Sequence, residues 1–332
     1  MKRVGQLMPL IADKTNLQEA FLRAARGKTG KYAVMEFRKN LDANLNALRH
    51  QLIEGDFHFG NYNFFTIHDP KKRVICAASF PERVVFHAMM RICHPVFDNY
   101  QIFDSYASRV GKGQYKALDR AKYYCQKYIW FAKMDVCKYF DTIDHNVMLH
   151  LLSKLFKDPQ LLLYFRDLLD SYEAEQGKGV PIGNLTSQYF ANHYLATADH
   201  FAKEQQGVPA IVRYMDDVLF FAETKESLCE YVGKYTGYLN ESLKLALHLP
   251  IINKVCYGVP FLGYVVYGER LRLNKRSRRR FVMKMQRMNE VYHLGRIDES
   301  KLARQTSCLF AFIDKADSHN FKHKQYNLGQ YS

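Results

Sequence analysis

The sequence lacks several features that define common classes of protein. It contains no run of about 18 apolar residues, the length that spans a bilayer. Residues 1–16 hold no apolar stretch of the signal-peptide type. Neither an internal repeat nor a low-complexity linker is present. With 332 residues, of which 48% are hydrophobic, the chain is long enough for two or three folded domains.

Cysteine is sparse and dispersed. No two cysteines form a Cys-x-x-Cys pair, and their number is odd. This pattern argues against both a disulfide framework and a structural zinc site, and it favours reduced thiols inside the cell. The expected location is therefore cytoplasmic. The seven cysteines are Cys76, Cys93, Cys125, Cys137, Cys229, Cys256 and Cys308.

Acidic residues are in the minority. The chain has 48 lysines and arginines against 33 aspartates and glutamates, which gives a net charge of +15. Such an excess implies a polyanionic partner, and nucleic acid is the usual one. A membrane surface is the alternative. Most of the 23 tyrosines and 23 phenylalanines are expected in the core, although some could stack on bases.

The most informative stretch is a pair of adjacent acids, Asp216 and Asp217. Apolar residues flank the pair over 210–212 and 218–222, which predicts a hairpin with both acids at its tip. Like charges so close repel each other, and a divalent cation relieves that repulsion. The alternative is an ordinary polar turn, because aspartate is a common turn residue.

A third acid, Asp135, ends an apolar strand predicted over residues 129–136. The order strand, helices, hairpin, helix, strand resembles a split βαβ unit, in which helices back an antiparallel sheet. Asp135 would then lie beside the hairpin tip, although 81 residues separate it from Asp216. Taken alone, Asp135 could simply cap its strand. Asp141 and Asp144 are expected to cap the helix that begins near His145.

Three such acids suit nucleotidyl transfer. Two Mg²⁺ ions about 3.5–4 Å apart can stabilise the attacking and leaving oxygens when a 3′-hydroxyl displaces pyrophosphate. Mg²⁺ usually takes one or two carboxylates, together with phosphates and water. Asp135 and Asp216 would each supply a carboxylate, Asp217 a weaker ligand and Val136 a carbonyl oxygen. We therefore predict a site for two Mg²⁺ ions, with Mn²⁺ as a possible substitute.

Hydrophobic periodicity predicts a mixed α+β chain. The first 55 residues show helical spacing, and two strands joined by a turn are expected over 57–68 and 73–78. Pro81 opens a helix with Val85, Met89, Ile92 and Val96 on one apolar face. A further strand is expected over 261–266, and a basic helical region follows from residue 275.

Together these residues resemble a reverse transcriptase. Tyr214-Met215-Asp216-Asp217 follows an upstream Phe-x-x-x-Asp-x-x-x-x-Phe-Asp pattern, which Phe131, Asp135, Phe140 and Asp141 form. The likeness covers nearly the whole chain in the family's order. It implies a right-hand polymerase with fingers and the start of the palm over 1–125, a ferredoxin-like palm over 126–267 and a basic helical thumb over 268–332.

The resemblance implies a set of residues around the incoming nucleotide. Lys71 and Arg73 match a fingers strand, where lysine acts as a point charge and arginine stacks or grips phosphate. Phe140 matches a steric gate beneath the sugar, with ordinary core packing as the alternative. Gln188 faces the nascent pair. Lys254 matches a lysine that could protonate pyrophosphate, and its alternative is a surface lysine.

The resemblance also implies contacts with the template and primer. Gly111 and Gly113 would let the backbone of a basic block approach a phosphate or base closely. Alternatives are helix capping for Asn184, a basic turn for the block and a solvated face for the basic helix. The residues expected to contact nucleic acid are Arg109, Lys112, Asn184, Tyr214, Met215, Gly263, Lys275, Arg276, Arg279 and Arg280.

One block of the sequence indicates which group of reverse transcriptases the chain resembles. Most reverse transcriptases have Gln-Gly-x-x-x-Ser-Pro before the long palm helix, whereas this chain has Ile182 in place of Gln and Gln188 in place of Pro. Both changes resemble the enzymes of diversity-generating retroelements. Ile182 cannot hydrogen-bond in the pocket, which we expect to loosen discrimination among pairs; simple packing is the alternative.

The enzymes of diversity-generating retroelements copy a template-repeat RNA with frequent errors at adenines. The resemblance therefore implies template RNA, cDNA or primer, dNTPs and a small basic accessory variability protein as partners, in a prokaryote or phage. The alternatives are a retron-like or group II intron-like reverse transcriptase of ordinary fidelity, and a catalytically silent RNA-binding module.

Overall fold

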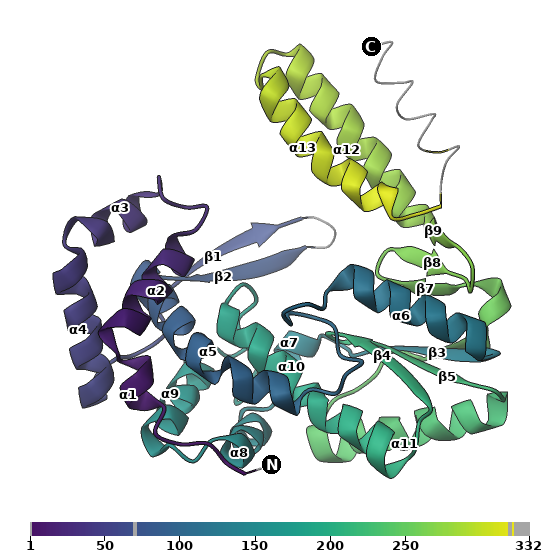
Figure 1. Cartoon of the computed structure of the whole chain (residues 1–332), viewed down its shortest axis with the longest axis horizontal. Helices are drawn as coiled ribbons and strands as arrows, with labels where there is room; N and C mark the ends of the chain where they lie inside the picture. The colour runs from purple at the N-terminus through teal and green to yellow at the C-terminus, as the bar shows by residue number, and fades with distance from the viewer. Residues whose placement is uncertain (1, 69–71, 318–320, 322–332) are drawn as a thin grey trace. The chain divides into compact units, whose positions relative to one another are not determined.

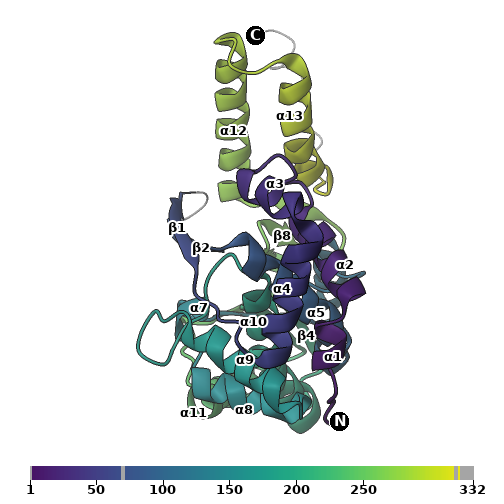
Figure 2. The same ribbon diagram turned by 90° about the vertical axis from the view of Figure 1, so that its left-hand side faces the viewer.

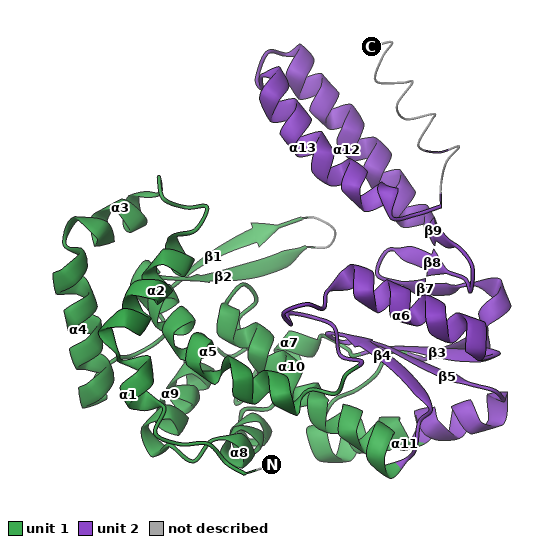
Figure 3. Ribbon diagram, in the orientation of Figure 1, with its two compact units in different colours: residues 1–103, 136–205, 234–248 green, residues 104–135, 206–233, 249–332 purple. Residues whose placement is uncertain are grey.

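The structure is a computed structural model that describes residues 2–68, 72–317 and 321 (Figure 1). Lys71 lies outside the described residues. The chain folds into two compact units, and each unit combines segments that are far apart in the sequence (Figure 3). Unit 1 comprises residues 1–103, 136–205 and 234–248, and unit 2 comprises 104–135, 206–233 and 249–332. The boundaries of the fingers, palm and thumb that we expect near residues 125 and 267 divide functional regions, and they remain a prediction.

Unit 1 is mainly helical, with one two-stranded sheet. The predicted apolar face of its long helix is confirmed, since Val85 and Met89 are fully buried, Val96 is nearly so and Ile92 is partly buried. Asp144 accepts a hydrogen bond from the Val147 amide and caps a helix as predicted, whereas Asp141 lies inside a short helix. The helices are α1 (Met8–Ile11), α2 (Lys14–Ala25), α3 (Tyr32–Lys39), α4 (Leu41–Glu54), α5 (Phe80–Tyr100), α7 (Tyr139–Thr142), α8 (His145–Leu155), α9 (Pro159–Asp170) and α10 (Leu185–His200), which a π-helical turn (Phe201–Gln205) follows.

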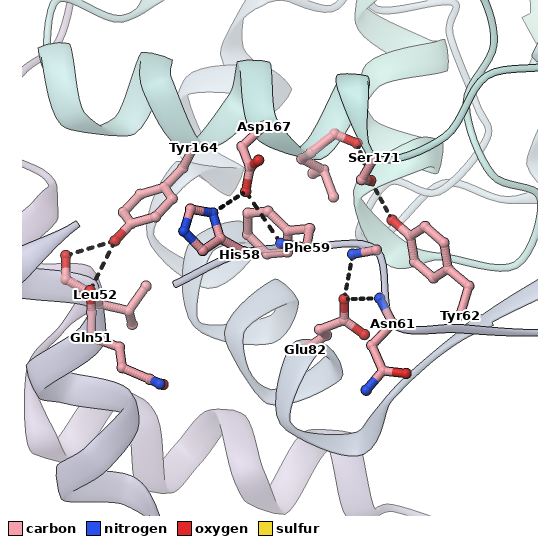
Figure 4. Close-up of polar contacts among 12 residues, drawn as sticks. Gln51, Leu52, His58, Phe59, Asn61, Tyr62, Glu82, Tyr164, Asp167 and Ser171 are labelled. Atoms are coloured by element: carbon pink, nitrogen blue, oxygen red, sulfur yellow. Dashed lines mark hydrogen bonds and ion pairs between the residues drawn. The ribbon is translucent and has the colours of Figure 1, made fainter. Parts of the chain in front are cut away.

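The antiparallel strands β1 (Tyr62–Ile67) and β2 (Arg73–Ala78) form a hairpin anchored at its base by the buried Glu82. Glu82 completes a capping box with Ser79, and its Oε1 atom accepts hydrogen bonds from the amides of Gly60 and Asn61 at 2.7 and 2.9 Å (Figure 4). The Tyr62 and Ser171 hydroxyls lie 2.7 Å apart. These contacts tie the hairpin to α5 and α9.

Unit 2 contains the sheet that bears the three acids. Its strands are β3 (Trp130–Asp135), β4 (Ala210–Tyr214), β5 (Asp217–Ala222) and β6 (Ile251–Lys254). They are antiparallel in the order β4-β5-β3-β6, so β3 lies between the hairpin and the last strand. The predicted hairpin and the predicted strand ending at Asp135 are both confirmed. This order is that of a split βαβ unit.

Helix α6 (Gln114–Lys127) covers part of one face of this sheet (Figure 1). Side chains alternate between the faces of a strand, so Phe131, Lys133 and Asp135 share one face of β3. Phe131 lies opposite Phe221, and both rings are buried in the core that includes Leu118 of α6. The same face is therefore apolar at one end and polar at the other, where Lys133 and Asp135 lie.

The rest of unit 2 is a small sheet and a helical pair. The single strand predicted over 261–266 is wrong, because a turn with positive φ at Leu262 and Gly263 divides it. Helices α12 and α13 run side by side (Figure 2).

No helix among the described residues is long and apolar enough to cross a membrane. The elements are a 3-10 turn (Val255–Tyr257), β7 (Val259–Phe261), β8 (Tyr264–Val266), β9 (Leu271–Leu273), α12 (Lys275–His293) and α13 (Glu299–Asp314), while α11 (Lys225–Leu243) is shared between the units.

Candidate active site

The three predicted acids meet at one end of the β3–β5 pair. Asp135, the last residue of β3, is the register partner of Asp217, the first residue of β5. Directly opposed residues of an antiparallel pair share a face, with Cβ atoms about 4.5–5.5 Å apart. Asp216 immediately precedes Asp217 in the turn. The structure thus brings Asp135 to the hairpin tip, as the sequence predicts.

The turn that holds Asp216 is a two-residue loop. Tyr214 pairs with Asp217, which leaves only Met215 and Asp216 between the strands. Met215 has a φ of 55°, a left-handed conformation that non-glycine residues rarely adopt. Its carbonyl oxygen accepts a hydrogen bond of 3.2 Å from Nη1 of Arg213, which is completely buried. The arginine thereby stabilises the turn.

A second buried group lies beside Arg213. The Arg213 amide donates to the Asp104 carbonyl, and the Arg213 carbonyl accepts from the Tyr106 amide, both at 2.9 Å. The buried Asp104 carboxylate pairs with Arg120 at 2.8 Å and accepts from the Tyr124 hydroxyl at 3.2 Å. Burial raises the pKa of Tyr124, so its hydroxyl stays a donor. We did not predict Asp104 or Arg213, because a charged residue in an apolar stretch gives no periodic signal.

Lys133 forms an ion pair with one of the acids, Asp217. Its Nζ atom lies 3.0 Å from Oδ2 of Asp217, and both side chains are largely buried, with exposed fractions of 22% and 17%. Burial is the main cause that raises the pKa of Asp217 to about 6; Lys133 opposes this shift, and Asp135 and Asp216 add to it. Side chains two residues apart on a strand share a face, so the sequence already predicts that Lys133 lies on the same face as Asp135. This alternation could have identified Lys133 as part of the site.

The donor set suits a hard divalent cation. Among the described residues no group of three His, Cys, Asp or Glu side chains is arranged to hold a metal. Mg²⁺ needs only one or two carboxylates when substrate phosphates and water complete its shell. Asp135 and Asp216 can provide these oxygens. Asp217 differs, because its Oδ2 atom contacts Lys133 while its buried Oδ1 atom has no hydrogen-bond partner in the part of the chain described.

Comparison with known protein families matches residues 68–266, more than half of the chain, to "Reverse transcriptase (RNA-dependent DNA polymerase)". The chain belongs to the reverse transcriptase family.

All seven of its cysteines are free, and none forms a disulfide.

Similar proteins include three whose names refer to introns. The COX1/OXI3 intron 2 protein of Saccharomyces cerevisiae is 26% identical over 131 residues, 37% of this chain and 15% of the yeast protein. The COX1/OXI3 intron 1 protein of that yeast is 25% identical over 169 residues, 48% and 20% of the two chains. Nuclear intron maturase 1 of Arabidopsis thaliana is 29% identical over 83 residues, 25% and 12% of the two chains. The matched regions span a fifth or less of these relatives.

Solved structures of telomerase are also similar. The apo telomerase of Candida tropicalis, truncated from its C-terminal domain, gives a TM-score of 0.49 at 13% identity, over 65% of this chain and 55% of that chain. The telomerase of Candida albicans in complex with a TWJ fragment of telomeric RNA gives 0.48 at 13% identity, over 84% and 60%.

Several residues that the reverse transcriptase resemblance assigns to nucleotide binding lie in unit 1. Arg73 is exposed at the start of β2, and the half-buried Phe140 packs edge-on against Tyr139. The Ile182 carbonyl accepts a 2.8 Å hydrogen bond from the Cys76 amide, which ties the Ile182 block to β2. Gly183 follows, and a Cβ there would lie 2.9 Å from Ile75. Val136 is also in unit 1, and its role as a ligand stays a prediction.

Asn184 and Gln188 line one cavity of unit 1, of about 310 Å³, with Arg83 and His87. Asn184 stands at the N-cap position of α10, but its side chain makes no capping hydrogen bond. Its buried Nδ2 atom has no partner among the residues described. The capping alternative for Asn184 is therefore wrong.

The structure does not bring Lys254 to the acids. Lys254 is the register partner of Trp130, and its ammonium lies 5.5 Å from the centre of that indole ring. Trp130 and Asp135 are the two ends of β3, and at about 3.3 Å per residue they lie roughly 17 Å apart. This register argues against the predicted general-acid role of Lys254.

The residues predicted to contact nucleic acid in unit 2 occupy several places. Gly111 and Gly113 both have positive φ, and Lys112 lies over the Tyr106 ring at 4.9 Å. Arg109 donates to the Ser105 carbonyl at 3.0 Å. Gly263 lies against Ser277 and Phe312. In the first turns of α12, Lys275, Arg276 and Arg279 are exposed and Arg280 is half-buried, which leaves a basic surface.

Proposed function

We propose that this chain is an RNA-directed DNA polymerase, which copies a template RNA into cDNA from dNTPs. One observation carries the proposal: Asp135 lies opposite Asp217, beside a two-residue turn that holds Asp216, in a chain of the reverse transcriptase family. The net charge of +15 suits a nucleic-acid substrate. Template RNA, primer and dNTPs are the partners that this function requires.

Asp135 and Asp216 would hold the divalent cations, which when bound stabilise charge on the attacking and leaving oxygens. The protein's own task is positioning. Arg213 fixes the turn through the Met215 carbonyl, and the rigid β3–β5 pairing fixes the separation of the acids. Such preorganisation lowers the barrier because no rearrangement is needed at the moment of reaction.

Primer extension on an RNA template tests this function. We expect Asp135→Asn and Asp216→Asn to lower the rate by about a hundredfold or more, since each removes an oxyanion that holds the metal. RNA affinity should change less than about twofold, because phosphate contacts dominate it. Asp119→Asn is the matched control, an exposed acid of α6 that pairs with Lys315. A wild-type chain that binds RNA but never extends a primer would show a silent RNA-binding module instead.

The more specific proposal is an enzyme of a diversity-generating retroelement. It rests on Ile182 and Gln188 in the block that packs beside β2. Such an enzyme would misincorporate opposite template adenines and would work with a small basic accessory variability protein, in the cytoplasm of a prokaryotic or phage-infected cell. Sequencing of cDNA from a defined template tests it. Ile182→Gln should lower the adenine error rate, and an error rate equal at all four bases would refute the subtype.

A group II intron-like reverse transcriptase is the second candidate. The similarity to two yeast intron proteins and to a plant intron maturase favours it. Such an enzyme would copy adenines with ordinary fidelity, and Ile182→Gln would leave its error spectrum unchanged. The same sequencing experiment therefore separates the two candidates.

A further inference from the structure

Lys133 occupies an unusual place for a lysine. It faces Leu219 across the β3–β5 pair, and Asp217 is its diagonal neighbour on the same face. Phe131, two residues earlier on that face, lies in the apolar core against α6. The ammonium therefore extends toward the acids, where it lies 3.0 Å from Oδ2 of Asp217. At 22% exposure it is a partly buried cation whose charge water screens only weakly.

Both carboxylate oxygens of Asp217 are enclosed by the protein. One of its oxygens contacts Lys133, and the other is buried with no hydrogen-bond partner in the described chain. A hydrated divalent cation cannot approach a carboxylate oxygen that solvent does not reach. Asp135 and Asp216 remain as the acids that can hold one.

We propose that Lys133 is a positioning residue that keeps Asp217 out of the divalent-cation site in the absence of nucleic acid. The idea rests on the proposed polymerase function. The ammonium of Lys133 offsets the charge of the Asp217 carboxylate, which weakens the binding of a divalent cation to the protein alone. A dNTP supplies further phosphate oxygens, which are the additional ligands that Mg²⁺ prefers. Tight binding of the cation thus depends on the nucleotide.

Direct measurement of Mn²⁺ binding to the full chain, without nucleic acid, tests this inference. Electron paramagnetic resonance gives the concentration of free Mn²⁺ during a titration. Lys133→Met removes a positive charge beside the site, and we expect about a tenfold gain in Mn²⁺ affinity. Addition of dNTP should strengthen binding to the wild type more than to the variant, because the variant already uses Asp217.

Three further variants make the result specific. Lys225→Met removes an exposed lysine near Trp130 in the same unit, and it should change Mn²⁺ affinity less than about twofold. Lys133→Arg keeps the charge and should keep wild-type affinity. Asp217→Asn added to Lys133→Met should abolish the gain, because the gain requires that carboxylate. Circular dichroism shows whether each variant folds, and Lys133→Gln replaces Lys133→Met if the latter does not.

Equal Mn²⁺ affinity in wild type and Lys133→Met would overturn the proposal, as would a gain that Lys225→Met shares or that survives Asp217→Asn. The titration requires no polymerase activity. A chain that never extends primers refutes the proposed function whatever Lys133 does, whereas unchanged Mn²⁺ binding in an active enzyme refutes only the role of Lys133.

Discussion

Arg213 and Met215, two residues apart, are joined across the start of the hairpin turn. The guanidinium of Arg213 is fully buried, and its Nη1 atom donates to the Met215 carbonyl at 3.2 Å. Alternation along β4 places the Arg213 side chain on the face opposite Tyr214 and the acids. The turn that holds Asp216 is thus supported from behind the sheet.

Arg213→Lys should weaken this support. Lysine keeps the charge but lacks the planar fork of donors, so the Met215 carbonyl loses its partner. We expect a loss of about 1–3 kcal/mol in the free energy of unfolding, as for other buried groups left unsatisfied. Urea denaturation measures it, with Arg270→Lys, an exposed arginine, as the control. If both variants unfold at the wild-type urea concentration, the hydrogen bond does not stabilise the turn.

Lys254→Ala should leave primer extension nearly intact. The β3 register places Lys254 at the Trp130 end, far from Asp135, so we expect less than about a threefold change in the single-turnover rate. General-acid catalysis typically contributes about a hundredfold or more. A loss of that size in Lys254→Ala, with RNA affinity unchanged, would restore the general-acid role.

Phe140→Ala should relax sugar discrimination. The Phe140 ring is half-buried, and its backbone carbonyl is fixed by the Val180 amide at 2.8 Å. If the ring excludes a ribose 2′-hydroxyl, its removal should raise incorporation of ribonucleotides relative to deoxynucleotides by about tenfold or more. Parallel extension assays with each nucleotide measure the ratio. Phe140→Tyr keeps the bulk and should behave as wild type, whereas unchanged discrimination in Phe140→Ala would reject the gate.

The buried His193 should make unit 1 sensitive to acid. Burial lowers its pKa to about 4, an effect that the Leu151 carbonyl opposes and His200 reinforces. An unfolded histidine has a pKa of about 6.5, so between these values only the unfolded chain binds the proton. The stabilisation is complete above pH 6.5 and is lost as the pH falls toward 4.

Urea denaturation at pH 7.5 and pH 4.5 measures this effect. Acidification should lower the free energy of unfolding of the wild type by about 2–3 kcal/mol more than that of His193→Gln, which has no titrating group at that position. Comparison of the two proteins cancels the contribution of other acids. Parallel losses in both would show that His193 is not the group responsible.

The sequence was sufficient to predict the elements that depend on local patterns. Apolar runs predicted the hairpin around Asp216 and the strand ending at Asp135. The order of the elements, which is that of a split βαβ unit, predicted that the two lie side by side. The sequence could not predict contacts that depend on the register between distant strands. The diagonal approach of Lys133 to Asp217, and the separation of Lys254 from the acids, depend on which residues of distant strands face each other.

Other features were hidden for different reasons. The buried ion pair of Arg120 with Asp104 looks like two surface charges in the sequence. The break at Leu262 depends on a positive φ that leucine seldom adopts, so an apolar run concealed a turn. The two units were hidden as well, because each combines segments that are remote along the chain.

Only two residues join Tyr214 to Asp217. One residue inserted into or deleted from β5 would reverse its parity, because side chains alternate at every step of a strand. Asp217 would then no longer share a face with Leu219 and Phe221, which fill the core against α6. A single in-frame codon gained or lost here would therefore remove either the acid from its site or the two apolar side chains from the core, so length at this hairpin is as constrained as the identity of its acids.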